Sequence, residues 1–297
     1  MNASTTQPLV LAEAGTPRAC IVLDDQADDC QRYAARELSD HLHAITGAHL
    51  PVTTRPLPGA AIRVGRSRHS QPLLEDIDWQ ALGDEGVVLR RRGDRLVLAG
   101  ASSRGTLYAV YEWLEQHLGI RWLTPDCTYM PRHERLAVDH LDTRLRPGYR
   151  MRDQNYMHAH DATWAARNRL NGQFPPLGPE HGGQWRFARH FVHTFYALVP
   201  PPQHYDRHPE YFSLVNGERL RSGGQLCLSN ADVLDLVCEA VTDWLEQAPD
   251  ARLVSISQND WYGACTCPAC HAIDEAEGSH SGTMVRFVNA VAERLEP

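Results

Sequence analysis

The sequence predicts an α/β protein in three parts: an N-terminal α+β domain (residues 1–130), a linker (131–148) and a region of alternating strands and helices (149–297). Two observations support this prediction. Apolar residues recur with strand and helix periods in turn along the chain, and the stretch between the two main parts is polar and mixed. A chain of 297 residues is also long enough for two domains.

The first domain is predicted to cover a mainly strand-built sheet with helices. Its expected elements are strands at 17–23 and 60–65, a helix over 27–47, a hairpin over 85–100 turning at Gly93-Asp94, a helix over 102–119 and a closing strand at 120–125. Each helix begins at an Asp or Ser able to cap it and ends at a glycine, Gly47 or Gly119.

The second region alternates strand and helix signals in a way that favours parallel βαβ units. The expected elements are strands at 149–158, 188–200, 225–230 and 252–257, a loop or hairpin at 208–219, and helices at 161–171, 231–249 and 282–296. In such folds, catalytic and ligand-binding residues lie at the C-terminal ends of the strands. Asp153, His193 and Asp260 are therefore expected on one rim.

Charge and hydropathy narrow the classes of partner. The net charge is −8, from 29 basic and 37 acidic residues, which argues against nucleic acid or an anionic membrane as the main partner. No apolar run is long enough to span a bilayer. Residues 1–15 lack the basic and apolar segments of a signal peptide, so the chain as written is expected to be cytoplasmic. A missing leader would make it secreted or periplasmic.

Two sets of motifs resemble known families. The stretches "AARELSDHLHAITGAHLPV" (34–52), "IRVG" (62–65) and "LVLAGASSRGTLYAVYEWLEQHLGIRWLTP" (96–125) resemble the non-catalytic domain that precedes the barrel in family 20 hexosaminidases and family 67 α-glucuronidases. A second set resembles the bacterial glycosidase-like family catalogued as domain of unknown function 4838. Its motifs are "HTF" (193–195), "HPEYFSLVNGER" (208–219), "QLCLSN" (225–230), "SISQND" (255–260), "CTCPAC" (265–270) and "EGSHSGTMVRFVNAVAE" (277–293).

The resemblance implies a (β/α)8 TIM-barrel-type region related to retaining glycosidases. A full barrel needs about 250 residues, more than residues 149–297 provide. The barrel-type region is therefore expected to be truncated after about four βα units, as in a fragment of a larger glycosidase-like protein.

Asp260 is the first candidate for a catalytic carboxyl group, because glycoside hydrolysis usually needs two of them across the scissile bond. It follows a predicted buried strand and precedes Trp261 and Tyr262, whose rings could stack on a sugar. Residues 257–261 fall where family 20 enzymes carry a His-x-Gly-Gly-Asp-Glu motif, so either Asn259-Asp260 stands in for Asp-Glu or Trp261 replaces the Glu. A structural Asp that caps the following turn is the alternative.

Further candidates are weaker. Glu210 is the second candidate for a catalytic carboxyl group, and the alternative is a structural role in which it holds its loop in place. The expected substrate-binding side chains are His193, Asp153, Asn259, Trp261, Tyr262 and Arg152. The alternatives are a core histidine at His193, a structural hydrogen bond at Asp153, and salt bridges at Arg152 and Arg167.

The cysteines divide into two groups. Cys265, Cys267 and Cys270 are spaced closely enough to converge on one ion, and Cys227 could supply a fourth ligand. A structural zinc, a disulfide with one free thiol, and reduced thiols remain three open interpretations. The other cysteines are expected to be reduced. No cofactor is expected to be required for catalysis, because no motif of an open catalytic zinc site is present.

The sequence therefore predicts a glycoside hydrolase-like protein that acts on carbohydrate, with N-acetylhexosaminides and uronides as the substrate classes. Whether it is an active enzyme stays open. The alternative is a fragment of a larger glycosidase-like protein, either a non-catalytic carbohydrate-binding one or a zinc-clipped interaction module. Neither nucleic acid nor a membrane is an expected partner, and the oligomeric state is not predicted.

Overall fold

The computed structural model describes residues 7–296 and divides the chain into two compact units, the first ending at Gln184 and the second beginning at Trp185. The first six residues lie outside the described residues. They are part of the stretch 1–15, which is predicted to lack a signal peptide. The chain mixes helices and sheets, so the predicted α/β class is confirmed at that level. Among the described helices, none is both long and apolar enough to cross a membrane.

A six-stranded sheet forms the centre of the first unit, in the order β11-β6-β7-β5-β3-β4. Strands β4, β3, β5 and β7 run parallel, while β6 pairs antiparallel with both β7 and β11. The bounds are β3 (Ala19–Val22), β4 (Val52–Thr53), β5 (Ala60–Val64), β6 (Val87–Arg92), β7 (Arg95–Gly100) and β11 (Asp142–Leu145). The predicted hairpin and both predicted strands of this sheet are therefore confirmed.

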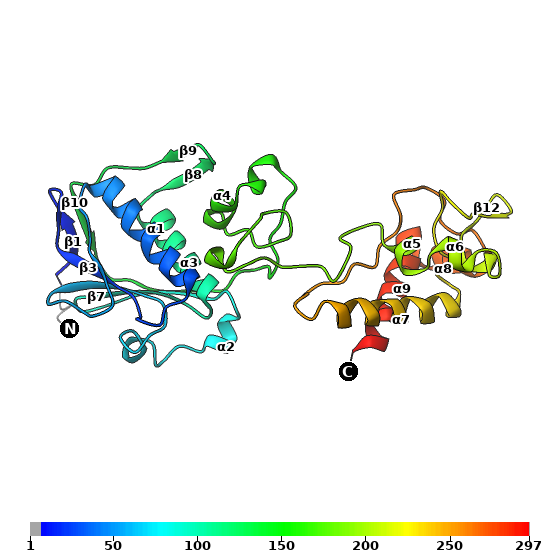
Figure 1. Cartoon of the computed structure of the whole chain (residues 1–297), viewed down its shortest axis with the longest axis horizontal. Helices are drawn as coiled ribbons and strands as arrows, with labels where there is room; N and C mark the ends of the chain where they lie inside the picture. Colours follow the sequence, from blue (N-terminus) through cyan, green and yellow to red (C-terminus); the bar gives the residue numbers. More distant parts are fainter. Residues whose placement is uncertain (1–6, 297) are drawn as a thin grey trace. The chain divides into compact units, whose positions relative to one another are not determined.

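Two helices, α1 (Asp29–Thr46) and α3 (Ser103–Glu112), pack together on one face of this sheet (Figure 1). The Asp28 carboxylate accepts the Gln31 backbone N–H and caps α1, which ends at Gly47 with φ of 74°. Glycine suits this left-handed end because it has no Cβ to clash. Ser102 caps α3, which continues as a π-helical turn, Trp113–His117. Both helices thus begin at a predicted capping position.

Residues 131–148 differ from the linker suggested by their polarity. They contain β10 (Arg135–Val138), which pairs antiparallel with β1 (Leu9–Glu13), and they contain β11 of the main sheet. Leu136 and Val138 are buried, but this strand is only four residues long and lies between charged residues, so it resembled a loop in sequence. The remaining strands are β2 (Thr16–Pro17), β8 (Arg121–Thr124) and β9 (Cys127–Tyr129).

The segment 149–184 packs on the first unit without forming the strand expected at 149–158. Its helix α4 (Ala162–Arg167) is anchored by Trp164, whose indole N–H donates to the Trp122 carbonyl at 3.1 Å. The other helical turns of this unit are Gln71–Leu73, α2 (Trp79–Leu82), Met157–His160 and Pro179–His181.

The second unit is mainly helical. Its apolar core forms where α7 (Ala231–Gln247) and α9 (His280–Leu295) pack around Phe212 and Phe287. The other elements are α5 (Phe195–Leu198), α6 (Pro201–His204), Pro209–Tyr211, β12 (Leu214–Val215), β13 (Glu218–Arg219) and α8 (Pro268–Glu277). The predicted helices α7 and α9 are confirmed, whereas α8 was not predicted.

The predicted truncated barrel is not confirmed. Within residues 185–296, the segments 188–200, 225–230 and 252–257 form no extended strands, only isolated bridges such as the parallel pair Phe187 and Leu253. The two segments meet again where the chain turns into α5, because the Thr194 and Phe195 N–H groups both donate to the Ser257 carbonyl at 3.1 Å.

Candidate functional site

The segment 258–265, which we call the rim loop, follows the half-buried run 252–257. One buried side chain holds its first half. The Gln225 amide donates to the carbonyls of Asn259 (3.0 Å) and Trp261 (2.6 Å) and accepts the Asn259 N–H (2.8 Å). Because these three bonds involve backbone groups of the loop, they fix its path whatever its exposed side chains are.

Asn259 is itself buried, and both ends of its amide are used inside the protein. Its Oδ1 accepts the Tyr196 N–H at 3.2 Å, and its Nδ2 donates to the Gly224 carbonyl at 2.9 Å. In this structure Asn259 therefore holds the loop, and its side chain does not face solvent as a substrate-binding amide would.

Asp260, Trp261 and Tyr262 point away from the core. Asp260 is exposed, Trp261 is 60% exposed and Tyr262 is fully exposed at 100%. Large aromatic side chains are rarely left this open, and where they gather beside polar groups they mark interaction surfaces. The sequence-predicted carboxylate and both predicted aromatic groups thus share one exposed stretch.

His193 lies at the base of the rim loop. Its ring Nδ1 is 3.2 Å from the carbonyl oxygen of Gln258, and its backbone has φ of 57°. A positive φ is uncommon for a residue other than glycine and is tolerated where the surroundings impose it. His193 is exposed, so the core-histidine interpretation does not apply here.

Glu210 is also exposed, in the turn Pro209–Tyr211 before β12. Its carboxylate lies 3.0 Å from the ring of His208, which stacks on Tyr211 with ring centres 4.6 Å apart. Its own backbone N–H and the His208 ring hold the pKa of Glu210 below its ordinary value. Glu210 is therefore suited to act as a carboxylate and not as a proton donor.

Arg152 and Asp153 belong to the first unit and make internal contacts there. Arg152 forms an ion pair with Glu85, and Asp153 accepts the backbone N–H of Gln173 at 2.8 Å. The salt-bridge interpretation of Arg167 is confirmed as well, because its guanidinium pairs with buried Glu37. These contacts occupy the groups that were expected to bind substrate.

The four cysteines Cys227, Cys265, Cys267 and Cys270 come together as a buried cluster. Their sulfur atoms all lie within 4.8 Å of one another, and none forms a disulfide. Hydrogen bonds from Cys265 and then Cys270 lower the pKa of Cys227, outweighing the effect of its burial. We call these four residues the cysteine cluster.

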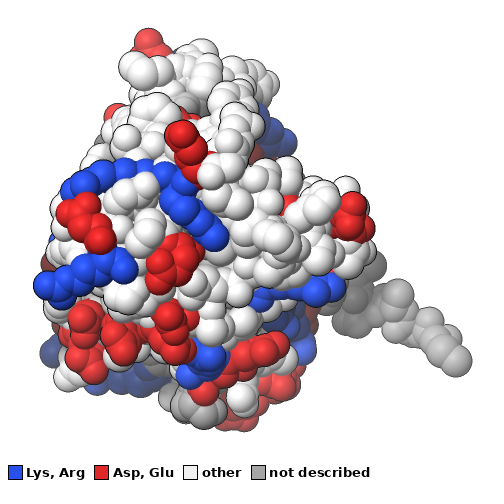
Figure 2. All heavy atoms as spheres, turned by 90° about the vertical axis from the view of Figure 1, so that its right-hand side faces the viewer, with Lys and Arg blue, Asp and Glu red and all other residues white. Residues whose placement is uncertain are grey.

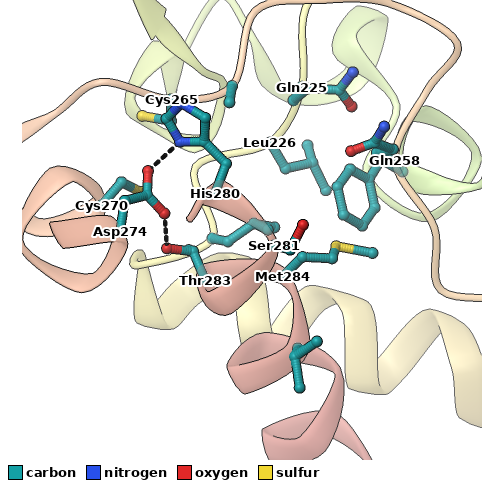
Figure 3. Close-up of a pocket in the computed structure, with 14 residues that line it drawn as sticks. Gln225, Leu226, Gln258, Cys265, Cys270, Asp274, His280, Ser281, Thr283 and Met284 are labelled. Carbon is teal, nitrogen blue, oxygen red and sulfur yellow. Dashed lines mark hydrogen bonds and ion pairs between the residues drawn. The ribbon is translucent and has the colours of Figure 1, made fainter. Parts of the chain in front are cut away.

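A pocket of about 200 Å³ lies between the rim loop, α8 and α9 (Figure 3). The side chains of His280 and Thr283 both point to the buried carboxylate of Asp274, which joins the two helices. Cys265 and Cys270 also line the pocket, so the cysteine cluster and the rim loop adjoin the same space.

Charge on the molecular surface is mixed where it can be seen. Figure 2 shows acidic and basic side chains interspersed on one face, without a broad patch of a single sign. Such a surface provides little long-range steering of a highly charged partner toward that face. The absence of a nucleic-acid partner stays a prediction.

Sequence reasoning missed the residues that support this site. Gln225 and Ser229 lie two positions before and after Cys227, and Arg219 lies beside Cys265. Helix α8 had a usable signal: Pro268 follows Cys267 at a position favourable for a helix start, and Gly278 ends the helix with φ of 72°.

Similar solved structures cover nearly the whole chain at low identity. A family GH115 4-O-methyl-α-glucuronidase with specificity for decorated arabinogalactans is 14% identical, with a TM-score of 0.44 over 95% of this chain and 40% of that chain. The Streptomyces plicatus N-acetyl-β-hexosaminidase is 15% identical, with a TM-score of 0.43 over 97% and 61%. The GH20 β-N-acetylhexosaminidase of Streptomyces coelicolor A3(2) is 16% identical, with a TM-score of 0.44 over 96% and 61%.

This chain therefore spans between 40% and 61% of the length of those three proteins. Comparison with the curated proteins finds none that matches.

Residues 11–113 match the N-terminus of glycosyl hydrolase family 67, which confirms the resemblance of the first domain. Residues 122–297 match the family described as Domain of unknown function (DUF4838), more than half of the chain. The chain thus belongs to the DUF4838 family.

Proposed function

We propose that this chain is a glycoside hydrolase-like protein that acts on carbohydrate, and that the exposed stretch Asp260 to Tyr262 contacts the sugar. One observation carries the proposal. The rim loop is held at its base by Gln225 and Asn259, yet it presents a carboxylate and two aromatic rings to solvent. A fixed loop with open aromatic faces loses little conformational entropy when a ligand binds.

The two catalytic candidates receive different roles. The lowered pKa of Glu210 suits a nucleophile or base, which leaves Asp260 as the proton donor. His193, at the base of the loop, would contact a sugar hydroxyl. The match to the family 67 N-terminus favours a uronide as substrate, with N-acetylhexosaminides as the other class to test.

A second candidate function is carbohydrate binding without turnover. Both Asp260 and Glu210 are exposed, whereas a general acid is usually kept protonated at neutral pH by burial. Under this alternative, Trp261 and Tyr262 contribute most of the binding energy and Asp260 only a hydrogen bond.

The test is a panel of uronides, N-acetylhexosaminides and neutral hexosides, with turnover and binding measured on the same preparations. We expect Asp260→Asn to abolish turnover while preserving binding, and Trp261→Ala to weaken binding. Tyr149→Ala is the matched control, because Tyr149 is 78% exposed but lies in the first unit.

The outcomes separate the functions. Turnover that depends on Asp260 supports the hydrolase. Binding that depends on Trp261 without any turnover supports the binding protein. No binding to any glycoside, or binding that Tyr149→Ala weakens as much as Trp261→Ala, overturns both.

A further inference from the structure

The strongest unassigned feature of the chain is the cysteine cluster. The Cys227 sulfur lies 3.7 Å from that of Cys267 and 3.9 Å from that of Cys270. Two sulfurs bound to one tetrahedral zinc, each at about 2.3 Å, are separated by about 3.8 Å. A disulfide would instead bring two sulfurs to about 2.05 Å. The spacing fits four ligands around one central ion.

We propose that Cys227, Cys265, Cys267 and Cys270 bind one zinc ion. Four thiolates arranged around a point are the typical ligand set of a structural zinc site. The sulfurs converge from three separate segments, namely the turn before α7, the end of the rim loop, and the start of α8. This inference does not depend on the proposed action on carbohydrate.

The surroundings of the cluster supply the donors that a zinc–tetrathiolate centre needs. Four thiolates exceed the charge of one zinc ion, so the centre stays negative and favours nearby N–H groups and cations. The backbone N–H of Leu214 donates to the Cys265 sulfur at 3.3 Å, and Nη1 of Arg219 lies 3.7 Å from the same sulfur. These groups compensate charge without occupying a ligand position.

Helix α8 adds a further favourable feature. Cys267 is its N-terminal capping residue and Cys270 lies in its first turn, so two ligands lie at the positive end of the helix dipole. The hydroxyl of Ser229 is 3.6 Å from the Cys267 sulfur and 3.1 Å from that of Cys270. Both contacts orient side chains that would bind the metal.

The role that follows is structural. All four positions of a tetrahedral ion would be filled by protein, which leaves no position for water or substrate. The ion would join Cys265, at the end of the rim loop, to Cys227, two residues after Gln225, which holds the start of the same loop. Both ends of the exposed stretch Asp260 to Tyr262 would then be attached to one centre. Figure 3 shows Cys265 and Cys270 beside the adjoining pocket.

The first experiment measures metal in the full chain, purified without chelator and without a metal-binding tag. We expect stoichiometric zinc in the wild type and its loss in Cys265→Ser and Cys270→Ser. Cys238→Ser and Cys127→Ser are matched controls, since these cysteines lie outside the cluster, and they should retain zinc. Stoichiometric iron in place of zinc would contradict the assignment.

A second measurement keeps the proposal testable if the variants fail to fold. Zinc is released from the wild type by a chelator, and thiols are then counted in denaturant without reductant. All eight cysteines should react. Cobalt substituted for zinc should give the sulfur-to-cobalt absorption of a tetrahedral thiolate site. A wild type that binds neither zinc nor cobalt, or a thiol count reduced by a disulfide, overturns the proposal.

Discussion

The two units of this chain differ in what holds each of them together. The first has a six-stranded sheet whose central strand, β7, is buried over Leu96–Ala99, with helices packed on one face. Within the residues that the structure describes, the second unit has the helices α7, α8 and α9 but only one pair of two-residue strands, and its loops meet at the cysteine cluster. The first unit therefore depends on sheet pairing and apolar packing, whereas the second has little sheet and would depend in addition on the proposed zinc centre.

Buried ion pairs sharpen the difference. In the first unit, Glu37 and Glu85 are buried carboxylates paired with Arg167 and Arg152 from the segment 149–184. These pairs attach that segment to the domain that precedes it. In the second unit, the buried sulfurs of four cysteines from distant segments lie within 4.8 Å of one another, and the proposed zinc would link them. Each unit should therefore respond to a different perturbation.

Metal removal should have the largest effect, and on the second unit alone. We expect chelation, or Cys265→Ser, to remove amide-exchange protection from the rim loop and from residues 212–230, because small zinc-linked folds lose structure without their ion. Strands β6 and β7 should keep their protection. Hydrogen exchange measured by mass spectrometry checks both regions at once, and Cys238→Ser serves as the control. Equal loss of protection in both units would contradict the comparison.

Breaking the Glu37–Arg167 pair should be the next largest effect, now confined to the first unit. Glu37→Gln leaves the Arg167 charge without its partner and should destabilise the unit by about 3–5 kcal/mol. The control is Glu277→Gln in the second unit, whose partner Arg286 is exposed, so the cost should stay below about 1 kcal/mol. Unfolding in denaturant, monitored by amide hydrogen exchange in α1 and in α9, measures the stability of each unit separately.

The same pair gives the first unit a dependence on pH. Burial raises the pKa of Glu37, but the hydrogen bond and charge of Arg167 outweigh it, so the net pKa lies below the ordinary value of 4.5. The stabilisation is therefore present above about pH 4.5 and is lost as the pH falls through the folded-state pKa. Wild type should lose stability on acidification more steeply than Glu37→Gln. Parallel curves for the two proteins would rule out this contribution.

A buried glycine offers a third, smaller perturbation of the first unit. A Cβ at Gly100 would lie 2.0 Å from the backbone carbon of Gly105 and 2.2 Å from the nitrogen of Thr106. Gly100→Ala must push α3 away from β7 and should cost about 1–3 kcal/mol. Gly148→Ala meets nothing within 4 Å and should change stability by less than about 0.5 kcal/mol. Chemical denaturation measures the unfolding free energy of both variants. An equal loss of stability in Gly100→Ala and Gly148→Ala would refute the packing argument.

The first unit was also the easier to predict from sequence. Its helices carry clear caps at Asp28 and Ser102, and its strands carry continuous apolar runs, so local signals agree with the fold. Residues 135–145 were missed because their strands are only four residues long and lie among charged residues. In sequence they resemble a loop until their partners β1 and β6 are known.

The candidate site was predictable only in part. The spacing of Cys265, Cys267 and Cys270 indicated a cluster, and the structure places Cys227, the suggested fourth ligand, beside them, while metal binding stays a prediction. Nothing local indicated that Gln225 would hold the rim loop, because that contact joins residues more than 30 positions apart. The run 252–257 looked like a strand, but whether it becomes one depends on the distant segment 186–195, which donates to Leu253 and Ser257 without forming a continuous ladder.

The smallest prediction compares the helix caps of the two units directly. Ser102 accepts the N–H of Gly105 at 3.1 Å, and Asn230 accepts that of Asp232 at 2.9 Å. Ser102→Ala and Asn230→Ala should each cost about 1 kcal/mol with metal present. The Asn230 N–H also donates to the carbonyl of Cys227 at 3.1 Å, which ties the start of α7 to the cysteine cluster.

Metal removal should separate these two equal costs. With chelator present, Ser102→Ala should still lower the stability of the first unit by the same amount. Asn230→Ala should then cost little, because the turn that places Asn230 is no longer held by Cys227. Thermal and denaturant unfolding of both variants, with zinc and with chelator, measures this difference. An undiminished cost of Asn230→Ala in chelator would mean that α7 is positioned by its apolar face alone, and that the second unit resembles the first more than its cysteines suggest.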